Sequence, residues 1–277
     1  MRDHARGCPQ RAVQAFLAAL NTRSLQIRVV LELFAGSCRW ARAVGQLGFY
    51  VIAIDTRFGE SNNLLSRKVQ NSVLGWIQAD LIHFILGGFP CQSLSRARNR
   101  PGGPPALRNG DNVLGIPGLA PWDQAKIVAG NEGVSFVIRV ARACIARRIV
   151  CILENPWTSW GWAFPAMKDL QRNANVRLTR TDFCQWGTCW KKSTGFLTTF
   201  CDVGFIDRRC HCKSRGICSR THRTHHPLVG CNAHGVFWTH IAEAYPVALC
   251  RALALMCRHS STALVMDHLD GFFCKIL

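Results

Sequence analysis

The chain has 277 residues, 48% of them hydrophobic, which is enough to bury a full core without disulfide bonds. Its 34 Lys and Arg outnumber its 16 Asp and Glu, which gives a formal net charge of +18. A charge of this size favours a polyanionic partner, nucleic acid, over a basic surface that is merely solvated. No run of about 18 uncharged apolar residues occurs, so the sequence predicts no membrane-spanning helix.

Fifteen cysteines are present, and several lie in apolar runs, where a free thiol behaves as a small hydrophobic side chain. A chain of this length does not need disulfide staples, and its polar first ten residues are not followed by a signal-peptide pattern. We therefore expect an intracellular protein, nuclear or cytoplasmic and not secreted, with mostly free thiols. Nothing in the sequence indicates a membrane association or an obligate protein partner.

The first strongly patterned stretch reads as strand, turn, helix, strand and acidic residue. The expected elements are a strand over 29–34, a helix over 39–47 and a strand over 50–54. Gly36 lies in the turn after the first strand, and Asp55 follows the second strand. In Rossmann-like nucleotide sites such a turn lets a cofactor approach the helix, and the acid binds ribose hydroxyls. Because no full G-x-G-x-x-G is present, S-adenosylmethionine (SAM) is favoured over a dinucleotide; Asp55 alone could equally cap a strand end.

The next strand ends carry a second acid and a thiol. A strand is expected over 73–77, ending near Asp80, whose carboxylate suits an adenine amino group or is simply a loop residue. An apolar run over 81–86 then opens into the loop Gly87–Ser93, with Cys91 at its tip. Ligands bind at the carboxyl ends of strands in open α/β sheets, so Cys91 is placed as a nucleophile, against the alternative of a buried thiol.

A Gly-, Pro- and Arg-rich segment over 96–121 follows and predicts either a mobile basic lid over nucleic acid or a disordered loop. Later elements are expected as a helix over 134–147, a strand over 149–153, a helix over 164–171, and strands over 176–183 and 195–200. Glu154 ends the strand over 149–153 and is the second catalytic candidate, with a loop cap as the alternative.

Strands that alternate with helices predict an α/β fold, a doubly wound and mostly parallel sheet with a small late Cys/His-rich insertion. The expected units are an N-terminal arm with a helix over 9–21 (1–27), a SAM-binding catalytic domain (28–200), a small basic region for target recognition (201–231), and a C-terminal helix that returns to the catalytic domain (232–277).

Within 201–231, four side chains have roughly the spacing of zinc ligands: Cys210, Cys212, Cys218 and His222. The alternative is a basic loop region whose Cys and His are incidental, because no clean C-x-x-C pair is present.

Several of these stretches, in order, resemble the DNA (cytosine-5) methyltransferases, a family of class I SAM-dependent methyltransferases. The resemblance lies in the SAM-binding turn at 31–37 (LELFAGS), the catalytic loop at 88–95 (GFPCQSLS), the Glu-Asn motif at 154–156 (ENP), Gln185, Lys191 and Thr194 in a later strand pair, and the final helix at 244–249 (AYPVAL). It spans about residues 28–257. The sequence differs from the family pattern at Cys38, where a small residue is common, and at Pro156, where the family has Val.

The resemblance implies a Rossmann-like methyltransferase fold, SAM as cofactor and DNA as partner, with RNA as an alternative. It implies catalytic roles for Cys91, Glu154, Pro90, Gln92 and Asn155, and cofactor contacts from Phe34, Ala35, Gly36, Ser37, Asp55, Asp80 and Pro90. Nucleic-acid contacts are expected from Arg96, Arg98, Arg100, Lys191 and Lys192, and a structural zinc from the Cys/His set.

The implied reaction is methyl transfer to carbon 5 of a flipped-out cytosine through a covalent adduct with Cys91. Glu154 would hydrogen-bond the base at N3 and at its exocyclic amine. Two alternatives stay open. One is an inactive nucleic-acid-binding protein with the same fold, which the side chain at Cys38 favours because it could crowd SAM. The other is a SAM enzyme that acts on RNA, or on an exocyclic amine held by Asn155, Pro156 and Trp157.

Overall fold

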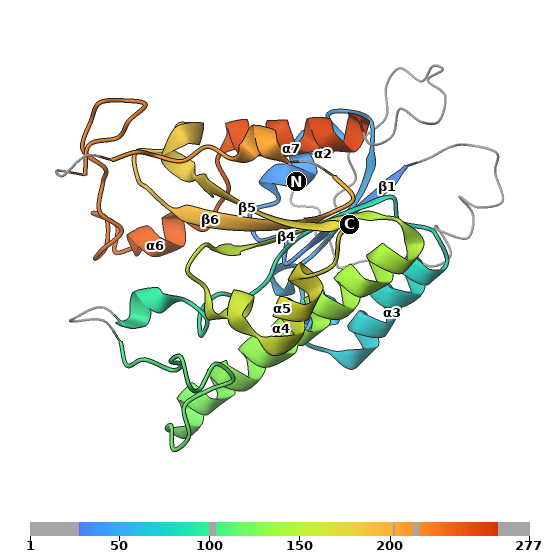
Figure 1. Ribbon diagram of the computed structural model, residues 1–277, viewed down its shortest axis with the longest axis horizontal. Coiled ribbons are helices and arrows are strands. Elements are labelled where there is room, and N and C mark those ends of the chain that lie inside the picture. Colours follow the sequence, from blue (N-terminus) through green and yellow to red (C-terminus); the bar gives the residue numbers. More distant parts are fainter. Residues whose placement is uncertain (1–27, 100–103, 202, 213–215, 260–277) are drawn as a thin grey trace, which may run out of the picture.

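The computed structural model describes residues 28–99, 104–201, 203–212 and 216–259, so the helix expected over 9–21 lies outside the described residues. The described chain forms one six-stranded sheet with the order β2-β1-β3-β4-β6-β5 (Figure 1). The strands are β1 (Val29–Leu33), β2 (Tyr50–Ile54), β3 (Phe84–Gly88), β4 (Val150–Pro156), β5 (Val176–Asp182) and β6 (Ser193–Thr199). The first four are parallel, and β6 runs antiparallel between β4 and β5. The predicted α/β class and mostly parallel sheet are confirmed.

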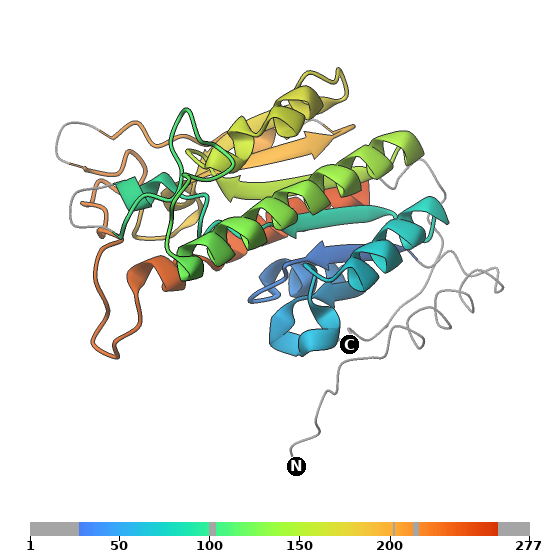
Figure 2. The same ribbon diagram turned by 90° about the horizontal axis from the view of Figure 1, so that it is seen from below.

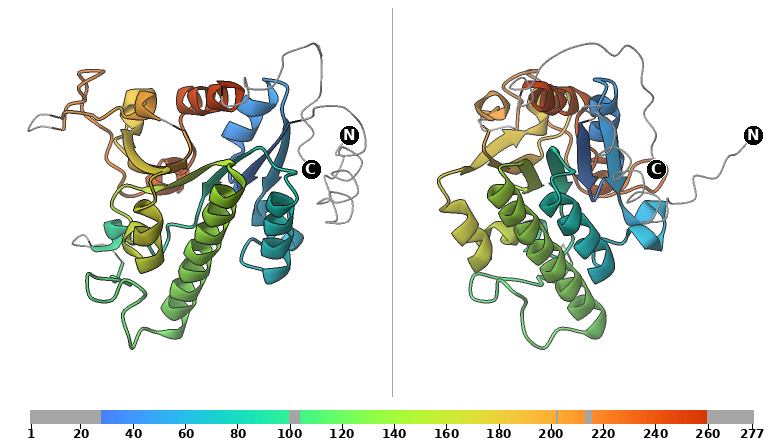
Figure 3. Two further views of the ribbon diagram at one scale, coloured as in Figure 1. Left: turned by 45° about the vertical axis from the view of Figure 1, so that its right-hand side comes forward. Right: turned by 90° about the vertical axis from the view of Figure 1, so that its right-hand side faces the viewer.

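Helices cover both faces of the sheet and make three layers (Figure 3). One face packs against α3 (Arg67–Gln78), α4 (Pro121–Arg147) and α5 (Pro165–Gln171), and the other against α2 (Arg39–Gly45) and α7 (Val247–His259), with the short α6 (Trp238–Ile241) before α7. Successive strand side chains point to opposite faces, so Leu31 and Leu33 enter the first core while Val30 enters the second. Sheets covered on both faces need such continuously apolar strands.

None of the helices within the described residues combines the length and apolarity that a membrane crossing requires. Figure 2 shows α4 running along the length of the sheet, with the segment before it folded back over its amino end.

The strand expected over 73–77 is wrong, because these residues belong to helix α3. Val69, Val73, Trp76 and Ile77 are buried and recur at helical spacing, so one helix face packs on the sheet and on α4. Two other helix bounds also differ from expectation. Helix α4 begins at Pro121 rather than near 134, and the final helix is broken between α6 and α7, where Pro246 precedes the first turn of α7.

The described part of the basic segment, residues 104–120, is anchored by one buried side chain. Arg108 is 1% exposed, and its guanidinium donates to the carbonyls of Ser93, Val113 and Ile127, to the Ser93 hydroxyl and to the Asn131 amide oxygen. Burial lowers the pKa of Arg108 to about 10. Charge-assisted hydrogen bonds of this kind hold the segment against α4 and against the loop that carries Cys91. The disordered alternative therefore does not apply to these residues.

Candidate active site

The candidate site lies at one edge of the sheet, where the parallel strands end. In the strand register Leu33 pairs with Ile54 and with Gly87, and Gly88 pairs with Glu154. The turn after β1, Asp55 after β2, the loop after β3 and Glu154 in β4 therefore reach the same edge. The chain leaves β1 toward β2 and returns to the other side at β3, so the topological switch point lies between β1 and β3, where open α/β sheets bind ligands.

The turn after β1 is strained and is braced by Asp55. Phe34, Gly36 and Cys38 all have φ between 50° and 55°, a region that non-glycine residues rarely adopt. The Asp55 carboxylate accepts a hydrogen bond from the Gly36 N–H at 2.9 Å, and its other oxygen accepts from the Arg57 N–H. Strained backbone of this kind concentrates at functional sites.

The space beside this turn is open. A Cβ built on Gly36 would meet nothing closer than the Phe34 carbonyl oxygen at 3.9 Å. The Cys38 side chain, which the sequence suggested would crowd a cofactor, is 4% exposed and packs in the core with Trp40 and Val44 of α2. The turn with its half-buried carboxylate therefore fits a ligand that carries hydroxyl donors.

Glu32 is a buried carboxyl group beside the same turn. It lies in β1 with 2% exposure and accepts a hydrogen bond from the Ala41 N–H in α2 at 3.0 Å. Burial raises the pKa of Glu32 from 4.5 to about 8, against a smaller opposing effect of that hydrogen bond. The folded protein therefore keeps this proton at neutral pH.

Replacing Glu32 by Gln should flatten the pH dependence of stability. Between pH 4.5 and about 8 the unfolded wild-type chain releases a proton that the folded state keeps. Stability therefore falls as pH rises through this window, and is fully present only below it. Thermal unfolding at pH 5 and pH 8 should show a loss of several degrees in the wild type that Glu32→Gln lacks. The exposed Glu60→Gln variant should behave as the wild type. If the unfolding temperature of the wild type and both variants falls equally between pH 5 and pH 8, Glu32 is not the cause of the pH dependence.

The loop that carries Cys91 is held from two sides. The Asn155 side chain is fully buried and donates from Nδ2 to the Phe89 carbonyl at 2.7 Å. On the other side, a Cβ built on Gly130 of α4 would lie 2.2 Å from the Ser93 hydroxyl, so only glycine lets the helix approach this closely. The Cys91 carbonyl accepts from the Leu94 and Ser95 N–H groups, which makes a helical turn directly after the thiol.

Glu154 lies next to this loop with one oxygen unpaired. It is 6% exposed, and its Oε2 accepts from the Tyr245 hydroxyl at 3.2 Å. Its Oε1 is buried without a hydrogen-bond partner and lies 4.0 Å from Lys192 Nζ. A Cβ on Gly88 would lie 2.5 Å from the Tyr245 hydroxyl, so this glycine makes room for the pair. A buried acceptor without a partner costs free energy unless a ligand satisfies it.

Burial shifts the pKa of both candidate groups toward their protonated forms. Burial raises the pKa of the Cys91 thiol; Lys192 opposes the shift, and Glu154 adds to it. Burial also raises the pKa of Glu154, against the effects of Lys192 and Tyr245. A thiol, a carboxyl group and an ammonium group thus influence one another at the end of β3 and β4. This combination suits a nucleophile next to a general acid.

One predicted cofactor residue is not at this edge. Asp80 follows α3, in the turn that leads into the amino end of β3, and it forms an ion pair with Arg147. The expectation that Asp80 contacts a cofactor is therefore wrong, because it depended on a strand over 73–77 that is a helix.

The residues predicted to contact nucleic acid have different surroundings. Arg98 donates to the Pro105 carbonyl and Lys191 to the Cys210 carbonyl, so both make internal contacts. Arg96 is exposed and stacks on the Trp160 ring at 3.9 Å, beside an open hollow of about 330 Å³ lined by Arg96, Trp157, Thr158, Ser159, Trp162, Ala163 and Lys168. Lys192 faces Glu154, and Arg100 lies outside the described residues. Gln92, directly after Cys91, is exposed at the tip of the loop, and Pro90, directly before Cys91, is partly buried.

The structure adds two residues to the candidate site and changes the metal set. Tyr245 and Glu32 were not predicted; a lone Glu inside an apolar strand was the available signal for the second. Of the four predicted metal ligands, Cys210 and Cys218 lie in a compact cluster with Cys184 and His225. The exposed His222 is not part of that cluster, and Cys212 lies at its edge.

The fold is that of a doubly wound α/β protein, and the candidate site lies at its switch point. No protein-family model and no curated protein sequence matches the chain. Among solved structures, the chain is similar to the Entamoeba histolytica methyltransferase EhMeth, with 9% identity over 65% of this chain and 55% of that one and a TM-score of 0.38. The chain thus spans about half the length of EhMeth.

Two human structures are also similar. The methyltransferase 10 domain containing protein shares 13% identity over 70% of this chain and 81% of its own, with a TM-score of 0.32. The N-terminal domain of METTL16, in complex with SAH, shares 15% identity over 69% and 68%, with a TM-score of 0.28. A TM-score below 0.5 does not carry function from any of these proteins to this chain.

Proposed function

We propose that the chain is a SAM-dependent methyltransferase that transfers a methyl group to carbon 5 of cytosine in DNA through a covalent bond to Cys91. The observation that carries the proposal is the pairing of Gly88 with Glu154 across β3 and β4, which sets the Cys91 loop against a buried carboxyl group with a free oxygen. SAM would be held at the Gly36 turn, where Asp55 offers carboxylate lone pairs to ribose hydroxyls next to open space. When bound, SAM supplies the electrophilic methyl group.

The residues of this chain account for the remaining chemistry. Cys91, as thiolate, forms a bond to carbon 6 of the ring, and its proton leaves to solvent. Burial raises the pKa of Glu154 and so favours its protonated form, which would donate to N3 as negative charge develops there. After carbon 5 gains the methyl group, water takes the carbon 5 proton, and the electron pair of that bond re-forms the carbon 5–carbon 6 double bond and expels the Cys91 thiolate. N3 returns its proton to Glu154 in the same elimination. Lys192 lowers the pKa of Cys91 and so favours the thiolate.

The charge of the chain and the surroundings of the loop support a nucleic-acid substrate. The net charge is +18, and Arg96 and Lys168 border a hollow that also contains Trp157 and Trp162. Arginine and lysine beside aromatic rings suit backbone phosphates and unstacked bases. A cytosine must leave the duplex to reach the thiol, so a surface that can hold an unstacked strand is required.

The amine-directed alternative is less well supported. A clamp for an exocyclic amine needs two free acceptors, one for each N–H. The Pro156 carbonyl already accepts from Trp162 Nε1 and from the Ser159 N–H, both at 2.9 Å. Asn155 Oδ1 alone remains without a partner, and the side chain that carries it is fully buried.

The proposal is tested by SAM calorimetry on the full chain, followed by transfer from methyl-labelled SAM to cytosine-containing DNA and RNA of the same sequence. We expect SAM binding, and 5-methylcytosine in the nucleosides from DNA. No detectable SAM binding by folded protein would overturn the proposal in favour of the inactive alternative. Label on the cytosine amino group, or in RNA alone, would overturn the DNA carbon-5 assignment.

A further inference from the structure

The region after β6 contains a cluster of thiols that the methyl-transfer site does not use. The sulfur atoms of Cys184, Cys210 and Cys218 and a ring nitrogen of His225 all lie within 4.8 Å of one another. The three cysteines are 0%, 6% and 2% exposed, and among the described residues they form a separate buried cluster that only Cys212 joins as a partly buried apolar neighbour. A cluster made of thiols differs from the two aliphatic and aromatic cores of the sheet.

The spacing of these atoms matches a tetrahedral metal. Zinc has bonds of about 2.3 Å to sulfur and about 2.1 Å to nitrogen, so its tetrahedral ligands lie about 3.8 Å apart for two sulfurs and about 3.6 Å apart for sulfur and nitrogen. The Cys210 and Cys218 sulfurs are 3.9 Å apart, and the Cys210 sulfur lies 3.6 Å from His225 Nε2. A disulfide bond would require a sulfur–sulfur distance of about 2.05 Å.

The surrounding groups suit thiolates. The Ser219 N–H is directed at the Cys210 sulfur at 3.4 Å, and the Gln185 amide lies 3.6 Å from the Cys184 sulfur and 3.8 Å from that of Cys218. Three thiolates and one neutral imidazole around Zn²⁺ carry a net charge of −1. Lys191 and Arg220 lie beside this cluster and compensate that charge.

We propose that the chain binds one structural zinc ion through Cys184, Cys210, Cys218 and His225. Cys212 supports this set from outside. Its sulfur is only 3.3 Å from that of Cys210, and it approaches His225 at Nδ1, the nitrogen opposite the metal, at 3.8 Å. Metal-bound histidines commonly donate their second N–H to such an acceptor, which fixes the orientation of the ring.

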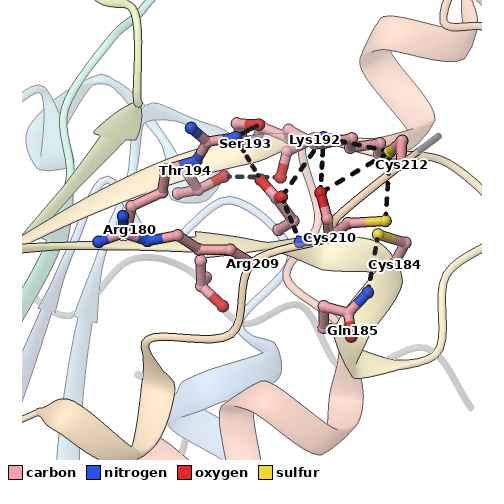
Figure 4. Close-up of polar contacts among 12 residues, drawn as sticks. Arg180, Cys184, Gln185, Lys192, Ser193, Thr194, Arg209, Cys210 and Cys212 are labelled. Carbon is pink, nitrogen blue, oxygen red and sulfur yellow. Dashed lines mark hydrogen bonds and ion pairs between the residues drawn. The ribbon is translucent and has the colours of Figure 1, made fainter. Parts of the chain in front are cut away.

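The zinc ion fastens a loop region to the catalytic sheet. Cys184 lies in the short helical turn directly after β5, and Figure 4 shows it next to Cys210, which comes from the segment after β6. Cys218 and His225 belong to the same segment, between β6 and α6, where the described residues form a short 3-10 helix and isolated bridges. Asp182, at the end of β5, also accepts from the Cys210 N–H at 2.7 Å. The connection between β5 and β6, which also carries Lys192, contacts the same region: Lys191 donates to the Cys210 carbonyl, and the Cys189 carbonyl accepts from the His226 N–H. Metal binding at this position contributes folding free energy to a region with little regular structure.

The test is the metal content of the full chain, and it does not depend on methyl transfer. The purified wild type should hold about one zinc per chain. Cobalt in place of zinc should give the visible bands of a tetrahedral site and thiolate-to-cobalt charge transfer. Cys218→Ser and His225→Asn should reduce zinc to less than about a tenth per chain.

Two matched variants serve as controls. Cys231→Ser removes an exposed thiol of the same region, and His222→Asn removes the histidine that spacing alone suggested. Both should keep the zinc. Folded wild type that holds neither zinc nor cobalt would overturn the proposal, as would loss of metal in His222→Asn with retention in His225→Asn. The cobalt spectrum is measured on the wild type, so it tests the proposal even if a variant fails to fold.

Discussion

Replacing Cys91 by Ser is expected to abolish the covalent complex with DNA that contains 5-fluorocytosine and to lower methyl transfer by on the order of 10⁴-fold. A serine hydroxyl ionises far less readily than a thiol, and it is a weak nucleophile unless a neighbouring base activates it. Fluorine at carbon 5 blocks the final proton loss, so the wild-type adduct persists. Mass spectrometry of the intact protein gives the mass gain directly.

The control for this prediction is Cys189→Ser, which removes an exposed thiol that lies outside the candidate site. It should form the adduct as the wild type does. SAM affinity should stay within about twofold in Cys91→Ser, because the cofactor turn follows a different strand. Wild type that binds SAM but forms no adduct would refute the cysteine mechanism while leaving the fold and the cofactor site intact.

On the acidic side of the pH profile, the rate of adduct formation should also rise with pH. Burial raises the pKa of Cys91 above its ordinary value of 9.0, so the thiol is protonated at neutral pH. Below that pKa the thiolate fraction grows about tenfold for each pH unit. The Lys192 ammonium group, which lies 4.0 Å from Glu154, lowers the pKa of Cys91. It therefore increases the fraction of Cys91 that is present as thiolate.

The sequence predicted those parts of the candidate site that depend on local pattern. A buried strand followed by a turn places its last residues at a sheet edge wherever the strand lies, so Gly36, Asp55, Cys91 and Glu154 were identified without coordinates. Asp80 was misassigned because residues 73–77 are β-branched and aromatic enough for a strand, yet Val69 and Val73 continue a helical repeat that packs on α4.

Contacts between distant segments could not be predicted in this way. Tyr245 reaches Glu154 from 91 residues away, and the packing of α7 on α2 brings it there.

The metal ligands could also not all be predicted from the sequence, because they come from distant segments. Spacing identified Cys210 and Cys218 because they are near in sequence, but Cys184 belongs to the turn after β5 and joins them only when β5 and β6 pair. His222 and His225 are equally plausible by spacing, and the fold turns only His225 toward the sulfurs.

Replacing Glu154 by Gln should reduce methyl transfer by about 10²- to 10⁴-fold, the usual contribution of a positioned general acid. Glutamine keeps the shape and can still accept from the Tyr245 hydroxyl, but it cannot give a proton to N3 when Cys91 adds to the ring. The fold should survive, because the amide has the size of the carboxyl group and avoids the burial cost that raises the pKa of Glu154. Circular dichroism and SAM calorimetry of the variant check this directly.

The pH profile separates catalysis from simple loss of packing at Glu154. In the wild type, activity rises as Cys91 ionises and falls as Glu154 loses its proton, which gives a bell-shaped profile. Glu154→Gln should keep the rising limb and lose the falling one, because its amide does not titrate. The matched control is Glu243→Gln, an exposed carboxylate whose charge also acts on Cys91. Its activity should change less than about threefold, since a remote surface charge is screened by solvent. If both variants lose activity to the same extent and with the same profile, Glu154 acts on the thiol only through its charge and does not donate to the base.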